Sequence, residues 1–303
     1  MSEISEAACT PLVNTTFLFA YSNDLTPEEV WTFWNYYDLW TTHYAYFASV
    51  RFDLTQNDDF FYHKNFDEAT PFVFAHLPNS TLGFNNSHTG SDVLHMIDRF
   101  FANTEYPLCG SMIIILLKRY PNTKYITKAI DKVRSYHASV SVVSAINPSG
   151  GLYPETMYQV ATETNGYCVF HYDGNFKWAA YNIPNIFFPF VIYSANVEAF
   201  GNGSFALRNM KVPDFNVYCI YITVQDYGPL DIFQHLKLSW YNESSSYSGA
   251  FEVSQYEVVK KYRSSNSVSY WFFLDATFYS MTLEYNSTSY APQILQIRVQ
   301  NAE

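Results

Sequence analysis

The chain has 303 residues, of which 48% are hydrophobic and 15% are charged. This much apolar material excludes global disorder, and the length fits two domains better than one. The net charge of −11, from 17 Lys and Arg against 28 Asp and Glu, excludes nucleic acid as a partner, because phosphate binding needs clustered basic side chains.

Short apolar runs alternate with helical patterns in the first part of the chain. Residues 16–22 form a run typical of a buried strand, and Thr26, Pro27 and the two glutamates after them are typical of a helix start. We expect further strands at residues 44–52, 71–76, 112–117, 140–146 and 167–171. We expect further helices from residue 89, over 123–137 with its basic side chains in solvent, and over 153–164. This alternation predicts a mainly parallel sheet covered by helices on both faces.

The pattern changes after about residue 185, where helical periodicity ends. Strand-like runs follow, separated by turn-forming residues, at residues 187–197, 217–224, 235–240, 268–274, 281–285 and 294–299. Residues 253–262 form either a short helix or a long connection. Short strands at this spacing predict an antiparallel β-sandwich. We therefore expect an α/β domain over residues 14–185 and a β-sandwich over 187–303.

Sequence features disagree about the compartment. No segment reaches the ~18 apolar residues of a membrane span, and residues 1–10 lack the basic and apolar regions of a signal peptide, which favours the cytoplasm. Four cysteines permit two disulfides in three pairings, or four buried thiols: Cys9, Cys109, Cys168 and Cys219. Asn-x-Ser/Thr sequons give a weak indication of glycosylation at Asn14, Asn79, Asn85, Asn202, Asn242 and Asn286.

Three segments of the first domain resemble a von Willebrand factor A-type domain. Residues 152–167 are similar to that family's late helix and the strand after it, residues 87–90 to its second loop, and residues 113–122 to its fourth strand and turn. The resemblance implies a doubly wound sheet whose loops meet at the carboxyl edge of the strands, where the family holds a divalent cation.

At most of the positions that match the metal ligands of that family, this sequence carries a different type of residue. Ala20 stands at the first Asp position, Ser22 keeps the middle Ser, and Asp24 stands at the last Ser. In the third loop, Lys118 falls where an Asp is expected. Because Mg²⁺ needs oxygen ligands and usually carboxylates, the resemblance implies a lost metal site and no cofactor. We expect Lys118 to pair with Asp24 and so partly replace the cation's charge.

An alternative for the same loops is a partial metal site. It would use the oxygen-bearing side chains that remain, which are Ser22, Asp24, Ser87 and Thr89.

The domain order resembles a group of secreted nematode proteins that join a degenerate A-type domain to a CUB-like β-sandwich. The resemblance implies an extracellular or secretory-pathway glycoprotein that binds a protein or glycan ligand, in surface defence (innate immunity) or adhesion. A cytoplasmic adaptor with reduced cysteines is an alternative. The A-type strand order further implies a Cys9–Cys109 disulfide, because the strands after these residues would be parallel neighbours. Cys168 and Cys219 would then be paired or buried.

Enzymatic motifs are weak in this sequence, and we predict no enzyme. No Gly-x-Gly-x-x-Gly, P-loop, His-Glu-x-x-His or Gly-x-Ser-x-Gly pattern is present. The remaining alternative is a hydrolase-like enzyme that uses the loops at the carboxyl edge of the first sheet. It would need a grouping of Ser22, His88 and Asp24.

Overall fold

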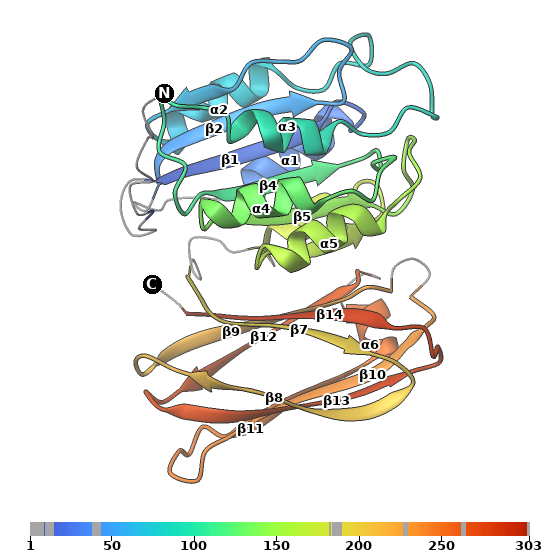
Figure 1. The fold of residues 1–303 in the computed structure, drawn as a ribbon. Helices are drawn as coiled ribbons and strands as arrows, with labels where there is room; N and C mark the ends of the chain where they lie inside the picture. The colour runs from blue at the N-terminus through green and yellow to red at the C-terminus, as the bar shows by residue number, and fades with distance from the viewer. Residues whose placement is uncertain are drawn as a thin grey trace. The chain divides into compact units, whose positions relative to one another are not determined.

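The computed structural model describes residue 9 and residues 15–37, 44–181, 183, 190–226, 230–261 and 265–301. Contacts between Cα atoms divide the chain into two compact units, Met1–Cys168 and Val169–Glu303. The predicted fold class is confirmed, because a mainly parallel α/β sheet is followed by two antiparallel sheets that form a sandwich (Figure 1). The predicted domain boundary near residue 185 stays a prediction.

A six-stranded sheet in the order β3-β2-β1-β4-β5-β6 forms the α/β domain. Its strands are β1 (Thr15–Ser22), β2 (Tyr44–Phe52), β3 (Phe61–His63), β4 (Met112–Leu117), β5 (Ser139–Ala145) and β6 (Cys168–His171). Strands β2, β1, β4 and β5 run parallel, whereas β3 is antiparallel to β2. Every residue of β1 and β4 is buried, as expected for central strands that helices cover on both faces.

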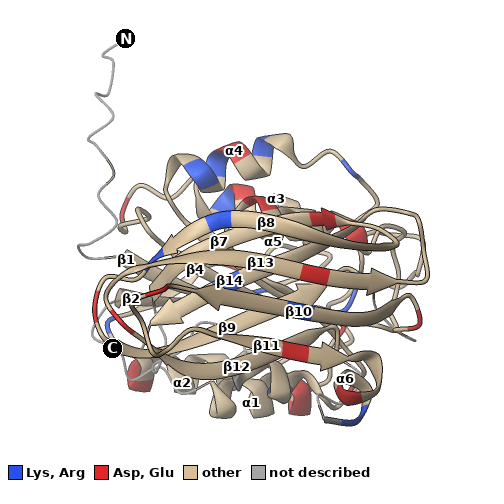
Figure 2. Ribbon diagram, turned by 90° about the horizontal axis from the view of Figure 1, so that it is seen from below, with Lys and Arg blue, Asp and Glu red and all other residues tan. Residues whose placement is uncertain are grey.

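Five helices cover this sheet: α1 (Pro27–Tyr36), α2 (Phe66–Ala75), α3 (Val93–Phe100), α4 (Thr127–Ser135) and α5 (Glu155–Glu163). Helices α1 and α2 lie on one face, and α3, α4 and α5 lie on the other (Figures 1 and 2). The predicted start of α1 is confirmed. The Thr26 hydroxyl accepts a hydrogen bond from the Glu29 amide at 3.2 Å, and the Glu29 carboxylate accepts one from the Thr26 amide.

The strand predicted at residues 71–76 is wrong, because these residues belong to α2. The Asn65 side chain caps this helix by accepting the Glu68 amide at 2.8 Å. Within the helix, Ala69 and Val73 are the buried residues, one turn apart. The local run of Phe and Val suggested a strand, but the cap upstream and the four-residue spacing of the buried positions decide for a helix.

The basic stretch around α4 lies on an exposed helix face, as predicted. Lys124 pairs with Glu155 at 2.7 Å, Lys128 and Lys132 approach Asp98, and Arg134 pairs with Glu163. Figure 2 shows blue basic positions on α4 next to a red acidic one. Exposed pairs of this kind each contribute ~0–1 kcal/mol, so they shape the surface more than the stability.

The second unit is a β-sandwich of two four-stranded sheets, β11-β10-β13-β8 and β12-β9-β14-β7. Its strands are β7 (Phe190–Ala199), β8 (Asn202–Lys211), β9 (Asn216–Val224), β10 (Phe233–Tyr241), β11 (Gly249–Ser254), β12 (Ser267–Leu274), β13 (Phe278–Ser287) and β14 (Gln293–Asn301). The sequence did not predict β8 and β11, the two edge strands of one sheet. Of the two expectations for residues 253–262, the short helix is correct, since α6 spans Gln255–Lys261.

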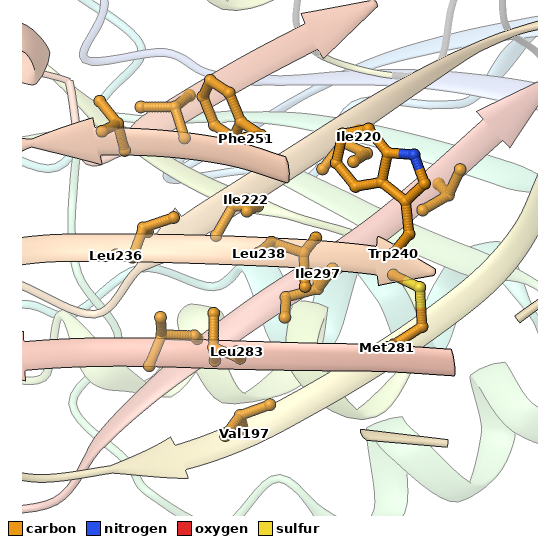
Figure 3. Packing of buried hydrophobic residues seen from close by; sticks show 14 of the residues in the cluster. Val197, Ile220, Ile222, Leu236, Leu238, Trp240, Phe251, Met281, Leu283 and Ile297 are labelled. Carbon is orange, nitrogen blue, oxygen red and sulfur yellow. The ribbon is translucent and has the colours of Figure 1, made fainter. Parts of the chain in front are cut away.

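The sandwich core forms because apolar side chains alternate along its strands. Leu236, Leu238 and Trp240 of β10 point inward, and the residues between them are partly exposed. They meet Ile220 and Ile222 of the opposite sheet (Figure 3). Burying each such side chain contributes about 1.5–3 kcal/mol, so this core carries most of the stability of the unit.

Cys9 and Cys109 form a disulfide, with their Cα atoms 5.5 Å apart, which confirms the predicted pairing. The bond is possible because β1 and β4 are parallel neighbours, with Phe17 opposite Met112, so that the segments before them lie at the same edge. Cys168 and Cys219 are both buried and neither forms a disulfide, so of the two alternatives for them burial is the one that the structure shows. Burial raises the pKa of the Cys219 thiol to about 12, which makes it inert.

Candidate functional site

A buried ion pair lies where the loops after β1 and β4 meet. The Nε and Nη2 atoms of Arg119 donate to the Asp24 Oδ2 atom at 2.8 and 2.7 Å. The side chains are 3% and 11% exposed, respectively. Charge-assisted hydrogen bonds shielded from water are stronger than those of surface pairs. The pair therefore fixes two loops that are 95 residues apart in sequence.

The predicted pair between Lys118 and Asp24 is wrong, because the next residue makes the contact instead. The Lys118 Nζ atom donates to the Asn147 carbonyl at 2.6 Å. Successive side chains leaving a strand point to opposite sides, so only one of these two basic residues faces Asp24. The sequence thus indicated the correct charge at the wrong position.

Arg119 also binds the loop before α3. Its Nη1 atom donates to the carbonyls of Asn86 at 2.8 Å and Thr89 at 2.6 Å. The guanidinium lies over the Phe84 ring, 5.5 Å from its centroid. Gly150 leaves room for this arrangement, since a Cβ atom there would lie 2.4 Å from Nη1. One side chain therefore holds together the loops that the A-type resemblance placed around a cation.

The structure brings some of the predicted site residues together and uses others only through their backbone. Ser22 is buried, and its hydroxyl donates to Asp53 at 2.5 Å and accepts the Asp24 amide at 3.3 Å. The carbonyl of Thr89 accepts from Arg119, and that of Ser87 accepts the Gly151 amide at 3.1 Å. Ser149, which the sequence analysis did not select, donates its hydroxyl to Asp24.

Asp53 is a functional candidate that sequence reasoning missed. It is fully buried directly after β2, in a left-handed backbone conformation with φ of 63°. Its carboxylate accepts the Ser91 hydroxyl at 2.7 Å and the Asp92 amide at 3.1 Å, besides the hydroxyl of Ser22. Burial raises its pKa to about 7; these two serine hydroxyls lower it, and the nearby carboxylates of Asp92 and Asp24 raise it further. The sequence feature that could have identified Asp53 is an acidic residue directly after a buried strand.

The residues at this edge do not fit a divalent cation. Such an ion needs several oxygen ligands with excess negative charge. Here a guanidinium neutralises Asp24, and the carboxylate of Asp53 is occupied by two hydroxyls and an amide. Within the part of the chain that the structure describes, no three acidic, His or Cys side chains are grouped to hold a metal. Arg119 supplies the positive charge that the resemblance assigned to a metal.

A cleft of about 780 Å³ opens beside this ion pair. The polar part of the cleft's lining is the ion pair itself, Asn23 and Ser149. The apolar part includes Leu25, Phe74, Leu77, Pro78 and Phe84. The Asn23 side chain holds the wall in place, since it exchanges two hydrogen bonds with the Asn79 backbone at 2.8 and 2.9 Å. This volume lies within the range of pockets that bind small ligands.

The geometry does not assemble the grouping that a hydrolase would need. The Ser22 hydroxyl is buried against Asp53, and Asp24 is engaged with Arg119. His88 lies on an exposed loop, where its amide donates to the Asn86 side chain at 2.6 Å.

The sequons differ in their surroundings. The side chains of Asn79, Asn85, Asn202 and Asn286 are exposed. Asn242 instead donates its amide to the Phe278 carbonyl at 2.7 Å and is partly buried. Asn14 lies outside the described residues.

Comparisons with known proteins match this architecture loosely. A family model described as a domain of unknown function (DUF7154) matches residues 195–302. Among curated proteins, none matches the chain. Similar solved structures include BatB, a conserved hypothetical protein from Bacteroides thetaiotaomicron, with 12% identity over 55% of this chain and 96% of that one and a TM-score of 0.35.

Two carbohydrate-binding modules are similar to the sandwich. One, from Cellvibrio mixtus lichenase 5A in complex with cellotriose, is 10% identical over 38% of this chain and 92% of its own, with a TM-score of 0.23. The other, the C-terminal module of LamC from Zobellia galactanivorans, is 19% identical over 38% and 97%, with a TM-score of 0.24.

Strand order and covering helices make the first part of the chain a doubly wound, mainly parallel α/β domain, and the second part is a β-sandwich. The finer assignment of the α/β domain to the von Willebrand factor A type stays a prediction. The finer assignment of the sandwich as CUB-like stays a prediction. Among the described residues, no helix is long and apolar enough to cross a membrane.

Proposed function

We propose that this chain is a non-enzymatic binding protein of the secretory pathway whose α/β domain binds its ligand without a metal ion. The observation that carries the proposal is the Arg119–Asp24 pair in the wall of the cleft. An A-type site that binds its ligand through a metal ion needs open coordination positions on that ion. Here the positive charge is the guanidinium of Arg119, which already donates hydrogen bonds to oxygen atoms of the protein.

The same pair indicates the charge of the ligand. Arg119 uses its Nε, Nη1 and Nη2 atoms within the protein, and Asp24 accepts from Arg119 and Ser149. Displacing either partner would leave a buried charge uncompensated, at a cost of about 3–5 kcal/mol. The cleft therefore favours an uncharged ligand that places apolar groups on Phe74 and Phe84 and leaves the hydrogen bonds of Asn23 and of the ion pair intact. A segment of a protein or a neutral glycan meets this description.

Secretory location is supported by the disulfide and by the exposed sequons. Four exposed acceptor asparagines around a disulfide-bonded α/β domain and a sandwich suit a surface protein. Defence or adhesion at a surface would be a role of this kind.

Ligand-detected NMR with equal numbers of neutral, anionic and cationic fragments tests the cleft. We expect neutral fragments to bind equally well in chelator and in Mg²⁺. Ala75→Trp should abolish binding, because residue 75 lines the cleft, and Ala102→Trp on another exposed segment should retain it. Binding that requires Mg²⁺, a preference for anions, or turnover of a bound ester would contradict the proposal.

A further inference from the structure

An exposed aromatic cluster lies at one end of the sandwich, on segments distant in sequence. It consists of Phe215 before β9, Tyr247 between β10 and β11, and Phe273 in β12, with exposed fractions of 56%, 38% and 50%. Their ring centroids lie 5.5 to 6.4 Å apart, and the rings of Phe215 and Phe273 are nearly parallel at 16°. The connections that carry the cluster gather at the left end of the sandwich in Figure 1. Clustered aromatic exposure of this kind marks a contact surface.

Hydrogen bonds from the buried core hold the loops of this cluster in place. The indole of buried Trp240 donates to the Tyr247 carbonyl at 2.8 Å. The hydroxyl of buried Tyr218 donates to the carbonyl of Asp214, next to Phe215, at 2.8 Å. Ser245 links its loop to the next by donating to Asp275 at 2.7 Å. A surface ordered before binding loses little conformational entropy when a ligand arrives.

The charged residues around the rings argue against an anionic ligand. The three connections, residues 212–215, 242–248 and 275–277, contain three acidic residues, Asp214, Glu243 and Asp275, and no Lys, Arg or His. An anionic ligand is therefore disfavoured. Serines at 244, 245, 246 and 248 supply hydroxyls, and loops rich in Tyr, Ser and Asn are typical of adaptable recognition surfaces.

The area of the aromatic cluster favours a small ligand over a protein partner. An aromatic side chain can bury ~150–250 Å², so three half-exposed rings present about 300 Å². A stable protein interface needs ~1,000 Å² or more, whereas one or two sugar rings fit this area. One face of a pyranose carries C–H groups that suit the negative face of an aromatic ring, and its hydroxyls suit surrounding carboxylates and serines.

We infer that Phe215, Tyr247 and Phe273 form a binding site for a neutral oligosaccharide. Sugar rings stack on the aromatic cluster and donate hydroxyls to Asp214 and Asp275. This site is separate from the cleft of the α/β domain and does not depend on it.

Calorimetric titration of the full chain with cellohexaose, laminarihexaose, chitohexaose and mannohexaose tests the inference. We expect saturable, salt-insensitive binding of at least one of them. Tyr247→Ala and Phe273→Ala should each weaken it about tenfold or more. Phe200→Ala is the matched control, because Phe200 is 55% exposed and precedes β8, whereas Phe215 follows that strand. Near-ultraviolet circular dichroism checks that each variant keeps its fold.

Three outcomes would overturn the inference. They are no binding of any of the four sugars, an equal loss in Phe200→Ala, or salt-sensitive binding of a tetralysine peptide in place of the sugars. Sugar binding abolished by Ala75→Trp but unchanged in the aromatic variants would overturn this site and support the cleft. The reverse result would support this site alone.

Discussion

At the scale of single residues, Arg119 determines the character of the α/β domain's carboxyl edge. It neutralises Asp24, binds two backbone carbonyls and lies over Phe84. Because the Arg119 side chain itself is buried, the loop arrangement depends on it more than on any exposed pair around α4.

Removing Arg119 should therefore cost far more than removing its neighbour. We expect Arg119→Ala to lower the free energy of unfolding by about 3–5 kcal/mol, since Asp24 would stay buried without a counter-charge. Lys118→Ala should cost less than about 1 kcal/mol, because the contact of its ammonium with the Asn147 carbonyl is exposed to solvent. Urea unfolding of both variants measures the difference, and similar losses would refute the role given to the guanidinium.

Asp53 should give the protein an unusual dependence on pH. Its folded-state pKa is raised from 3.8 to about 7, so the folded state holds the proton more tightly than the unfolded chain. The stabilisation is complete below pH ~4 and is lost as the pH rises to ~7, by up to about 4 kcal/mol. Asp53→Asn, which cannot ionise, should flatten the unfolding free energy across this window. A wild-type profile without such a decline would show that Asp53 ionises normally.

At the scale of elements, the disulfide attaches the segment before β1 to the start of β4. It closes a loop of 100 residues between Cys9 and Cys109. In the chain-entropy model, such a loop stabilises the fold by up to ~4.7 kcal/mol. We expect the Cys9→Ser, Cys109→Ser double variant to unfold at lower urea concentration, with fluorescence as the measurement. An unchanged midpoint would mean that the bond adds nothing to the packing of β1 against β4.

For the molecule as a whole, the number of cysteine thiols distinguishes a secretory protein from a cytoplasmic one. A secretory protein with this structure should show two free thiols after denaturation without reductant, Cys168 and Cys219, and none before it, since both are buried. A cytoplasmic adaptor should show four. Thiol counting on protein isolated from its natural source decides between them, and recovery of Cys9 as a thiol would remove the main support for secretion.

The two-part architecture could be predicted from the sequence alone, because strand and helix periodicities are local consequences of which faces are buried. The sequence also placed the first helix cap and, through the strand order that the resemblance implied, the Cys9–Cys109 pair. Segments 71–76 and the edge strands β8 and β11 were missed. Their local patterns are weak, and a cap or a neighbouring strand decides their conformation.

The site could not be predicted in this way, because it depends on contacts between residues far apart in the sequence. Whether Lys118 or Arg119 faces Asp24 depends on how the chain turns after β4, and Asp53 becomes unusual only because the surrounding elements bury it. The aromatic cluster is a further example. Its members, Phe215, Tyr247 and Phe273, are far apart in the sequence and come together only when the sandwich folds. Burial and long-range proximity are properties of the folded chain, because both come from residues many positions away in the sequence.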